Sequence, residues 1–308
     1  IINSGKYDLS REKKNGYSGY QQLFMGDNDC NPEAMQEIIF PIRQDGVKTE
    51  SYAGTSYLIN ACNKAGMPYA STSDPWSCLF ARVDLVKKFF PNGDIPMAAK
   101  EDIPENATQE KIIAKDNEKG FSTANVVAKA KDDRALFYMG IGGCSDKVRT
   151  LTPGDAITGP LNGASFVKWT NLHADGTAQH HQKFSDTDFP VFRLAEIYLT
   201  RAEAKYRLNG SQDGLEDILK VQDRANRQIK ASSVDEQTLI DEWCREFYME
   251  GRRRSDLVRF GLFTGSKYLW SFKGGSENGQ GIPAKCDIYP IPGDEIKNNP
   301  NMHQNPKY

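Results

Sequence analysis

The chain has 308 residues and a mass of 34.5 kDa, which is enough for one large domain or two ordinary ones. It carries 39 Lys and Arg against 41 Asp and Glu, whereas nucleic-acid-binding proteins and polybasic membrane-surface segments have a clear basic excess. The net charge of −2 therefore argues against nucleic acid as a partner. An aromatic content of 10% with a mean hydropathy of −0.62 indicates a globular, loop-rich chain rather than a disordered one.

The sequence shows neither a recognisable targeting signal nor a CxxC cysteine motif. No run of about 18 apolar residues is present, so no membrane-spanning helix is expected. The chain starts at Ile1 without the Met or the basic segment of a signal peptide, and we interpret it as a processed or truncated piece. Its six cysteines contain no CxxC pair, so we expect most to be free packing thiols, with one or two long-range disulfides if the protein is exported.

The first part of the chain, residues 1–189, is predicted to be an irregular lobe of loops, short strands and short helices. Residues 37–42 (EIIFPI) are typical of a strand. Residues 76–90 predict a short helix, because apolar side chains recur at three- and four-residue steps before Pro91 ends it; these are Leu79, Val83, Val86 and Phe90. Residues 91–188 are predicted to be mostly loop, with short strands at 134–139 and 165–169.

The second part, residues 190–264, has the spacing of three consecutive helices. The first carries an apolar stripe ending before Gly210, formed by Val191, Ala195, Tyr198, Ala202 and Tyr206. The second faces inward through Leu215, Ile218, Leu219, Ala225 and Ile229. The third begins with a capping box at 233–236, carries Trp243 on its core stripe and ends near Gly251. Alanines on the first helix favour the close packing of helix-pair repeats, and residues 265–308 are predicted to be loop and tail.

Two groups of titratable residues are candidates for a metal site or a catalytic site. His173, His180 and His181 lie in a polar loop without the usual metal-ligand spacing, so we interpret them as surface-loop residues. Glu246 and Glu250 share a helix face, but the arginines that follow would keep them ionised, which is wrong for a general acid. We instead predict an internal ion-pair network among Glu196, Glu203, Glu246, Glu250, Arg193, Arg201, Arg252 and Arg259.

Three separated motifs occur at residues 189–204, at residues 245–261 and in the tail from residue 289. Together they resemble the C-terminal half of the SusD/RagB family of outer-membrane nutrient-binding lipoproteins. Residues 189–204 (FPVFRLAEIYLTRAEA) look like a helix motif of that family. Residues 245–261 (REFYMEGRRRSDLVRFG) and the tail from 289 (YPIPGDEI, then NPN and QNPKY) are similar to two further motifs in the same order. Lys307 stands where the family tail usually has Gly.

The resemblance implies a mainly α fold in which tetratricopeptide-like helical repeats support an irregular ligand-binding lobe. On this basis 1–308 is the C-terminal portion of one SusD-like domain, with 1–189 as ligand-binding lobe, 190–264 as helical repeats and 265–308 as C-terminal tail. It further implies a non-enzymatic protein on the outer face of the outer membrane. Such a protein would bind a glycan and deliver it to a SusC-like TonB-dependent transporter, with a lipid anchor in the N-terminal part of the family.

Candidate ligand residues are aromatic side chains in polar, loop-forming stretches. Flat aromatic rings stack on the C–H faces of sugars, while neighbouring polar groups bind sugar hydroxyls. The stretch 52–76 and the stretch 265–281 have this composition, which predicts a ligand set of Tyr52, Tyr57, Tyr69, Trp76, Asn60, Asp74 and Trp270. Trp76 could equally begin the 76–90 helix as a core anchor, and Trp270 could also be a packing residue.

Two other classes of function remain open from the residues. A secreted glycoside hydrolase would need a buried carboxylate pair and would release reducing ends. A helical-repeat adaptor for peptides or proteins would retain no sugar and would tolerate loss of Trp76 and Trp270. No cofactor is predicted, although the loops leave room for a divalent cation.

Overall fold

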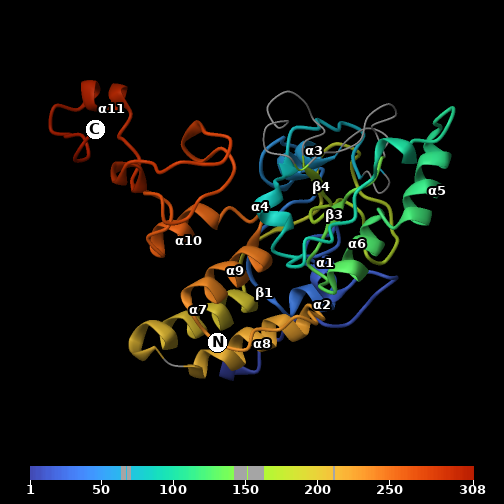
Figure 1. Cartoon of the computed structure of the whole chain (residues 1–308), viewed down its shortest axis with the longest axis horizontal. Helices are drawn as coiled ribbons and strands as arrows, with labels where there is room; N and C mark the ends of the chain where they lie inside the picture. The colour runs from blue at the N-terminus through green and yellow to red at the C-terminus, as the bar shows by residue number, and fades with distance from the viewer. Residues whose placement is uncertain (64–66, 68–70, 142–150, 152–162, 211) are drawn as a thin grey trace. The chain divides into compact units, whose positions relative to one another are not determined.

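The computed structural model describes residues 1–63, 67, 71–141, 151, 163–210 and 212–308. These form two compact units, a large unit, Ile1–Met249, and a C-terminal unit, Glu250–Tyr308. Helices outnumber the short strands among the described residues, as expected for a mainly α protein (Figure 1). The helices of the large unit are α1 Gly19–Gln22, α2 Pro32–Met35, α3 Gly54–Cys62, α4 Val83–Val86, α5 Gln109–Lys119, α6 Thr123–Ala130, α7 Leu194–Asn209, α8 Leu215–Arg224 and α9 Glu236–Phe247.

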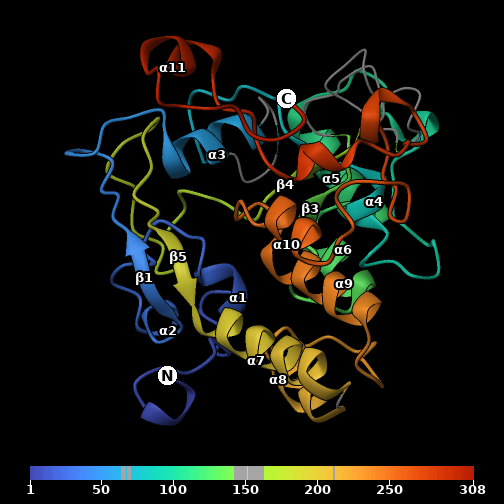
Figure 2. The same ribbon diagram turned by 90° about the vertical axis from the view of Figure 1, so that its left-hand side faces the viewer.

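Two small antiparallel sheets hold distant parts of the large unit together. β1 (Ile38–Ile42) pairs with β5 (Phe189–Arg193), as Figure 2 shows. A second sheet has the strand order β2 (Phe80–Ala81), β4 (Ala164–Phe166), β3 (Phe137–Tyr138). The strands predicted at 37–42, 134–139 and 165–169 are therefore confirmed, the last two in shortened form.

The three helices predicted in the second part of the chain are confirmed as α7, α8 and α9. Both α8 and α9 pack against α7, and a Cβ on Gly214, just before α8, would lie 2.7 Å from the carbonyl oxygen of Ala202. The close helix contact therefore depends on small residues, as predicted. Gly210 has φ +64° and ends α7 in the left-handed conformation that glycine tolerates best.

Three details of the predicted helices are wrong. Val191, which was assigned to the apolar stripe of the first helix, lies in strand β5. α9 begins two residues later than the predicted capping box implies, because Asp235 rather than Ser233 caps the helix: its carboxylate accepts the main-chain N–H of Thr238. Ile229, which was assigned to the inner face of the second helix, lies beyond the end of α8 and is 47% exposed.

The helix predicted over 76–90 is also wrong, since only Val83–Val86 is α-helical. The main-chain N–H groups of Trp76, Ser77 and Cys78 donate to carbonyls near the end of α3 and so are not used in a helix of their own. Val86 and Phe90 are nonetheless buried, as the apolar spacing predicted. The prediction of mostly loop over 91–188 missed α5 and α6; Thr108 caps α5, and Gly120 (φ +80°) ends it.

The core of the large unit joins the helical layer to the irregular lobe. Tyr248, just after α9, stacks on Phe137 and Phe166 of the second sheet at centroid distances of 5.5 and 5.9 Å. Trp169 stacks on Phe189 of β5 at 5.3 Å with the ring planes 7° apart. These contacts make the lobe and the helices of the large unit one hydrophobic structure.

The C-terminal unit contains α10 (Arg253–Arg259), α11 (Gly293–Asn298), two short 3-10 segments at Lys273–Gly275 and Ala284–Asp287, and otherwise loop. The prediction of loop and tail over 265–308 is confirmed only in part, because it missed α11. Across the described part of the chain, no helix has the length and apolarity needed to cross a membrane. Cys30, Cys62, Cys78, Cys244 and Cys286 are free thiols, and Cys144 lies outside the described residues. The predicted three-part division of the chain stays a prediction.

Candidate functional site

Helix α3 positions two of the predicted ligand aromatics. Tyr57 lies on the helix, and Trp76 is fixed at its end, because the last carbonyls of a helix need donors from outside it. Trp76 N–H donates to Asn60 O at 2.8 Å, and Cys78 N–H donates to Ala61 O at 2.9 Å. Ser77, between them, has φ +54°, which is an uncommon value for a residue other than glycine. The indole is thus attached to α3 through its own backbone.

Three of the predicted aromatics meet on the surface of the large unit. The ring of Trp76 lies 5.6 Å from that of Tyr52 and 5.8 Å from that of Tyr57, with interplanar angles of 46° and 63°. Both tyrosines are 44% exposed, and Trp76 is half-buried. We call Tyr52, Tyr57 and Trp76 the aromatic platform. Asp74, two residues before Trp76 in the sequence, is half-buried. Tyr69 lies outside the described residues.

A second loop, residues 180–188, contacts the platform at Tyr52. Phe184 contacts Tyr52 edge-on at 5.1 Å, and His181 stacks on Phe184 at 4.7 Å with the rings 23° apart. Phe184 was not among the predicted ligand residues, and His181 was interpreted as a surface-loop residue without a role in binding. The polar surroundings of 180–184 match those of the predicted aromatics, so the same compositional signal could have found both.

Several hydrogen bonds hold this second loop against α3. Ser185 N–H donates to Ser56 Oγ at 2.9 Å, and Thr55 Oγ1 donates to Thr187 O at 2.7 Å. Asn60 Nδ2 donates to Lys183 O at 3.2 Å. Asn60 is fully buried, so the structure gives this predicted ligand residue a supporting contact within the protein.

Two buried carboxylates, Asp186 and Asp188, follow Phe184 in the second loop. Asp186 accepts hydrogen bonds from His173 Nε2 at 3.0 Å and from the main-chain N–H of His180 at 2.9 Å. The hydrogen bond to Asp186 raises the pKa of His173 above its usual value, although burial opposes it. The side chain of His173 is only 8% exposed, so its assignment to the loop surface was wrong, whereas that of His180 is 64% exposed as expected.

Asp188, two residues after Asp186, is buried and accepts the main-chain N–H of Gln44 at 2.8 Å. Burial raises the pKa of Asp188 to about 6, although Arg43, 3.3 Å away, opposes the rise. Within the described ranges, no group of three or more His, Cys, Asp or Glu side chains could hold a metal ion.

Trp270 belongs to the C-terminal unit. Its ring is stacked on Phe263 at 6.0 Å, and the Lys273 ammonium lies 4.7 Å from the ring centroid. Lys273 is itself buried, and its Nζ donates to the carbonyl of Tyr268 at 2.6 Å. Trp270 therefore has packing contacts on its own unit, and its role in binding stays a prediction.

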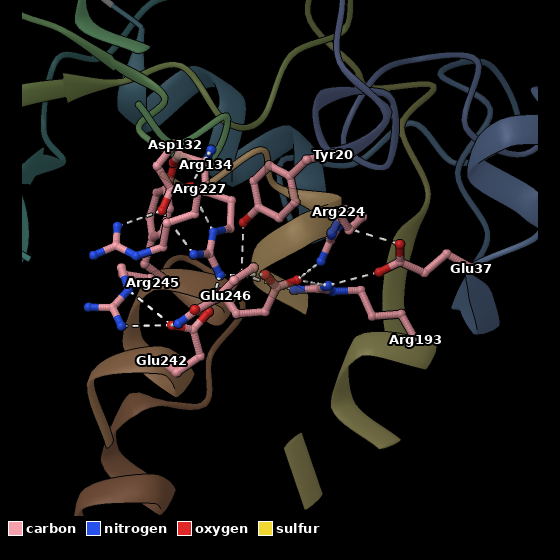
Figure 3. Close-up of polar contacts among 12 residues, drawn as sticks. Tyr20, Glu37, Asp132, Arg134, Arg193, Arg224, Arg227, Glu242, Arg245 and Glu246 are labelled. Atoms are coloured by element: carbon pink, nitrogen blue, oxygen red, sulfur yellow. Dashed lines mark hydrogen bonds and ion pairs between the residues drawn. The ribbon is translucent and has the colours of Figure 1, made fainter. Parts of the chain in front are cut away.

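The acidic and basic residues near Glu246 form a buried ion cluster (Figure 3). Glu246 pairs with Arg193 and Arg224, and with Arg134 at 3.0 Å. The predicted pair of Glu246 with Arg193 is confirmed. The other members were not predicted. Glu242 and Arg245 share α9 with Glu246, and the rest come from other segments; they are Glu37, Asp132, Arg134, Arg224 and Arg227.

The ion cluster keeps its carboxylates ionised. Burial by itself would raise the pKa of Glu242, but Arg134 and Arg245 outweigh it and hold this pKa at about 2. Burial is likewise outweighed at Glu246, where Arg224, Arg193 and Arg134 hold the pKa well below its usual value. These acids cannot donate a proton near neutral pH, so this cluster is a scaffold rather than a general acid site, as the sequence suggested.

A cavity of about 660 Å³ lies elsewhere in the large unit, between α6 and the segment after β4. Val127, Lys168 and Trp169 are among its lining residues. The predicted ligand residues that the structure describes do not line it. The platform is thus a surface site, separate from this cavity.

Comparison with known proteins places the chain in a family. The SusD family profile matches residues 36–308. The chain is 52% identical over 295 residues to the starch-binding protein SusD of Bacteroides thetaiotaomicron, covering 94% of this chain and 52% of that protein. It is 28% identical over 210 residues to the SusD-like protein P25 of Formosa agariphila, covering 65% of this chain and 38% of that protein. The chain thus spans about half the length of the first relative.

Solved structures share the fold. Surface glycan-binding protein A from Bacteroides thetaiotaomicron, also solved in complex with laminarihexaose, matches 99% of this chain and 57% of its own with a TM-score of 0.60. A protein of the same name from Bacteroides uniformis matches with a TM-score of 0.58 over 99% of this chain and 54% of its own. Identities of 18% and 16% limit these two matches to the fold. The profile match over most of the chain and the predicted SusD-like architecture agree: this chain belongs to the SusD family.

Proposed function

We propose that this protein binds a glycan at the cell surface without cleaving it, and that the aromatic platform is the binding site. The single observation that supports this most directly is the meeting of Tyr52, Tyr57 and Trp76 as exposed or half-buried rings beside helix α3. Aromatic rings of this kind offer large contact area at a low cost in conformational entropy, and each tyrosine adds a hydroxyl.

The mutual angles of the rings favour a ligand that curves around them. Rings inclined by 46° and 63° to Trp76 cannot all lie flat against one straight, planar chain. Asp74 adds a carboxylate near Trp76 for sugar hydroxyls, and Asn60 acts by holding the neighbouring loop. Since the relative with 52% identity is named a starch-binding protein, a starch-type glucan is the first candidate.

Delivery to a SusC-like TonB-dependent transporter and a position on the outer membrane are the remaining parts of the proposal. They rest on membership of the family, as does the lipid anchor in its N-terminal part. The transporter would accept the glycan from the platform. A pull-down of the full-length protein from detergent-solubilised outer membranes, with recovery of a TonB-dependent barrel, tests this part separately.

Native affinity electrophoresis through gels that contain single glycans tests binding. The panel includes starch, laminarin and a set of host and microbial glycans, and a reducing-end assay is run on the same mixtures. We expect retardation by at least one glycan without release of reducing ends, and loss of retardation for Trp76→Ala.

The matched control is Phe192→Ala, which removes another exposed aromatic (47% exposed) that lies outside the platform. Retardation that survives Trp76→Ala unchanged would contradict the platform as the site. Release of reducing ends by the wild-type protein would instead support the glycoside hydrolase alternative, and a protein that no glycan retards would support the adaptor alternative.

A further inference from the structure

The row of aromatic rings continues beyond the predicted ligand residues. From Tyr57 it runs through Trp76, Tyr52 and Phe184 to His181, with neighbouring ring centroids 4.7–5.8 Å apart. Phe184 and His181 are half-buried, so parts of both side chains reach the surface. His181 forms one end of this row and is separated from Trp76 by three ring contacts.

The contacts of His181 leave one of its ring nitrogens available. Nδ1 accepts the main-chain N–H groups of Lys183 at 3.0 Å and Phe184 at 3.2 Å, so in the neutral ring the proton is on Nε2. Within the described part of the chain, Nε2 makes no hydrogen bond. His181 therefore combines an aromatic face with an N–H donor, which is the pair of features that suits a sugar ring and its hydroxyl.

The loop that carries His181 is held in place without any ligand. Asn171 Nδ2 donates to His181 O at 3.3 Å and to Phe184 O at 3.2 Å. Ser73 N–H, three residues before Trp76, donates to Gln182 O at 2.9 Å, which joins this loop to the segment that bears the platform. A side chain on such a rigid, anchored loop can contact ligand with little further loss of entropy.

The geometry points to His181 as a further ligand-contacting residue, which binds an outer sugar unit of a chain already stacked on the aromatic platform. This inference rests on the proposed function and extends it from one stacking point to an elongated site. Because His181 lies at the far end of the row, only a glycan long enough to pass Tyr52 and Phe184 would reach it. The inference therefore predicts an effect that depends on ligand length.

The test measures dissociation constants of the full chain for maltotriose and maltoheptaose by calorimetry. The variant is His181→Asn, because the Asn Oδ1 can accept the same two main-chain N–H groups as Nδ1 and so preserve the loop. We expect His181→Asn to weaken maltoheptaose binding roughly fivefold, as loss of about 1 kcal/mol implies, and to leave maltotriose binding unchanged.

His180→Ala is the matched control, since its side chain is exposed and it is not part of the row of rings. His181→Ala, which also removes the loop anchor, should weaken maltoheptaose binding at least as much as His181→Asn. Wild-type affinity of His181→Asn for maltoheptaose, an equal loss for both ligands, or no binding of maltoheptaose by the wild-type protein would each overturn the inference.

Trp76→Ala in the same experiment separates this inference from the proposed function. If Trp76→Ala abolishes binding while His181→Asn binds maltoheptaose like the wild type, the platform stands and only the role of His181 fails. If the wild type binds and Trp76→Ala has no effect on either sugar, both the platform and its extension fail.

Discussion

The main-chain N–H of Trp76 donates to the carbonyl oxygen of Asn60 at 2.8 Å, so the indole is fixed by the end of helix α3. The same residue, Asn60, donates through its side-chain amide to the loop that carries Phe184 and His181. One buried asparagine thus connects both loops that bear the exposed aromatics. The proposed binding surface is therefore held by hydrogen bonds within the protein, without any ligand.

The aromatic ring of Tyr52 should contribute more to glycan affinity than its hydroxyl group. Tyr52 contacts both Trp76 and Phe184, so Tyr52→Ala removes a stacking surface from the middle of the row. We expect Tyr52→Ala to raise the dissociation constant for the retained glycan about tenfold, and Tyr52→Phe to change it less than about threefold. Calorimetric titration of both variants checks this, and a Phe variant as weak as the Ala variant would contradict it.

Glu246→Gln should strongly destabilise the protein. It leaves Arg134, Arg193 and Arg224 buried with one carboxylate fewer, and breaking a buried ion pair typically costs about 3–5 kcal/mol. Urea unfolding followed by circular dichroism measures the loss. Glu118→Gln, which removes an exposed pair with Lys115, is the control and should unfold like the wild type. A Glu246→Gln protein as stable as this control would show that the cluster is dispensable.

The ion cluster should also make the protein sensitive to acid. The ordinary pKa of a glutamate is 4.5, and burial alone would raise it at Glu242 and Glu246. The neighbouring arginines have the larger effect and lower both pKa values, that of Glu242 to about 2. Their stabilising effect is therefore complete above pH 4.5 and is lost as the pH falls through the folded-state pKa values. The unfolding free energy of the wild type should fall between pH 4.5 and 2, with a shallower fall in Glu246→Gln. Equal slopes would contradict the pKa assignment.

His173 should contribute the opposite pH dependence. Its hydrogen bond to Asp186 raises the pKa of the imidazole above 6.5, so the stabilisation is complete below pH 6.5 and is lost as the pH rises through the folded-state pKa. Unfolding free energies measured from pH 6 to 9 should decline less in His173→Gln than in the wild type. His303→Gln, at an exposed position, is the control; a His173→Gln profile parallel to the wild type would exclude the ion pair.

Much of the fold was predictable because its signals are local. The apolar spacing and the terminal Gly210 define α7, and the β-branched run at 38–42 defines β1. Helix α5 was missed although its cap at Thr108 and its glycine stop are equally local. The helix assigned to 76–90 failed because the backbone of Trp76 donates to α3, sixteen residues earlier in the chain, which spacing alone cannot show.

The site was only partly predictable for the same reason. Tyr52, Tyr57 and Trp76 are close in sequence, so their composition indicated a common surface. Phe184 reaches Tyr52, and His181 reaches Phe184, on a loop whose Ser185 N–H donates to Ser56 Oγ, 129 positions away. Such a contact leaves no periodic signal in the sequence. Arg134, a further partner of Glu246, was missed likewise, since it comes from a loop 112 residues earlier.

The most direct test of the central claim is a crystal structure of the protein with the glycan that retards it in affinity gels. The account predicts an ordered sugar ring lying flat on the indole of Trp76, with a neighbouring unit against Tyr52. A glycan bound elsewhere, with Trp76 and Tyr52 free of contact, would contradict it.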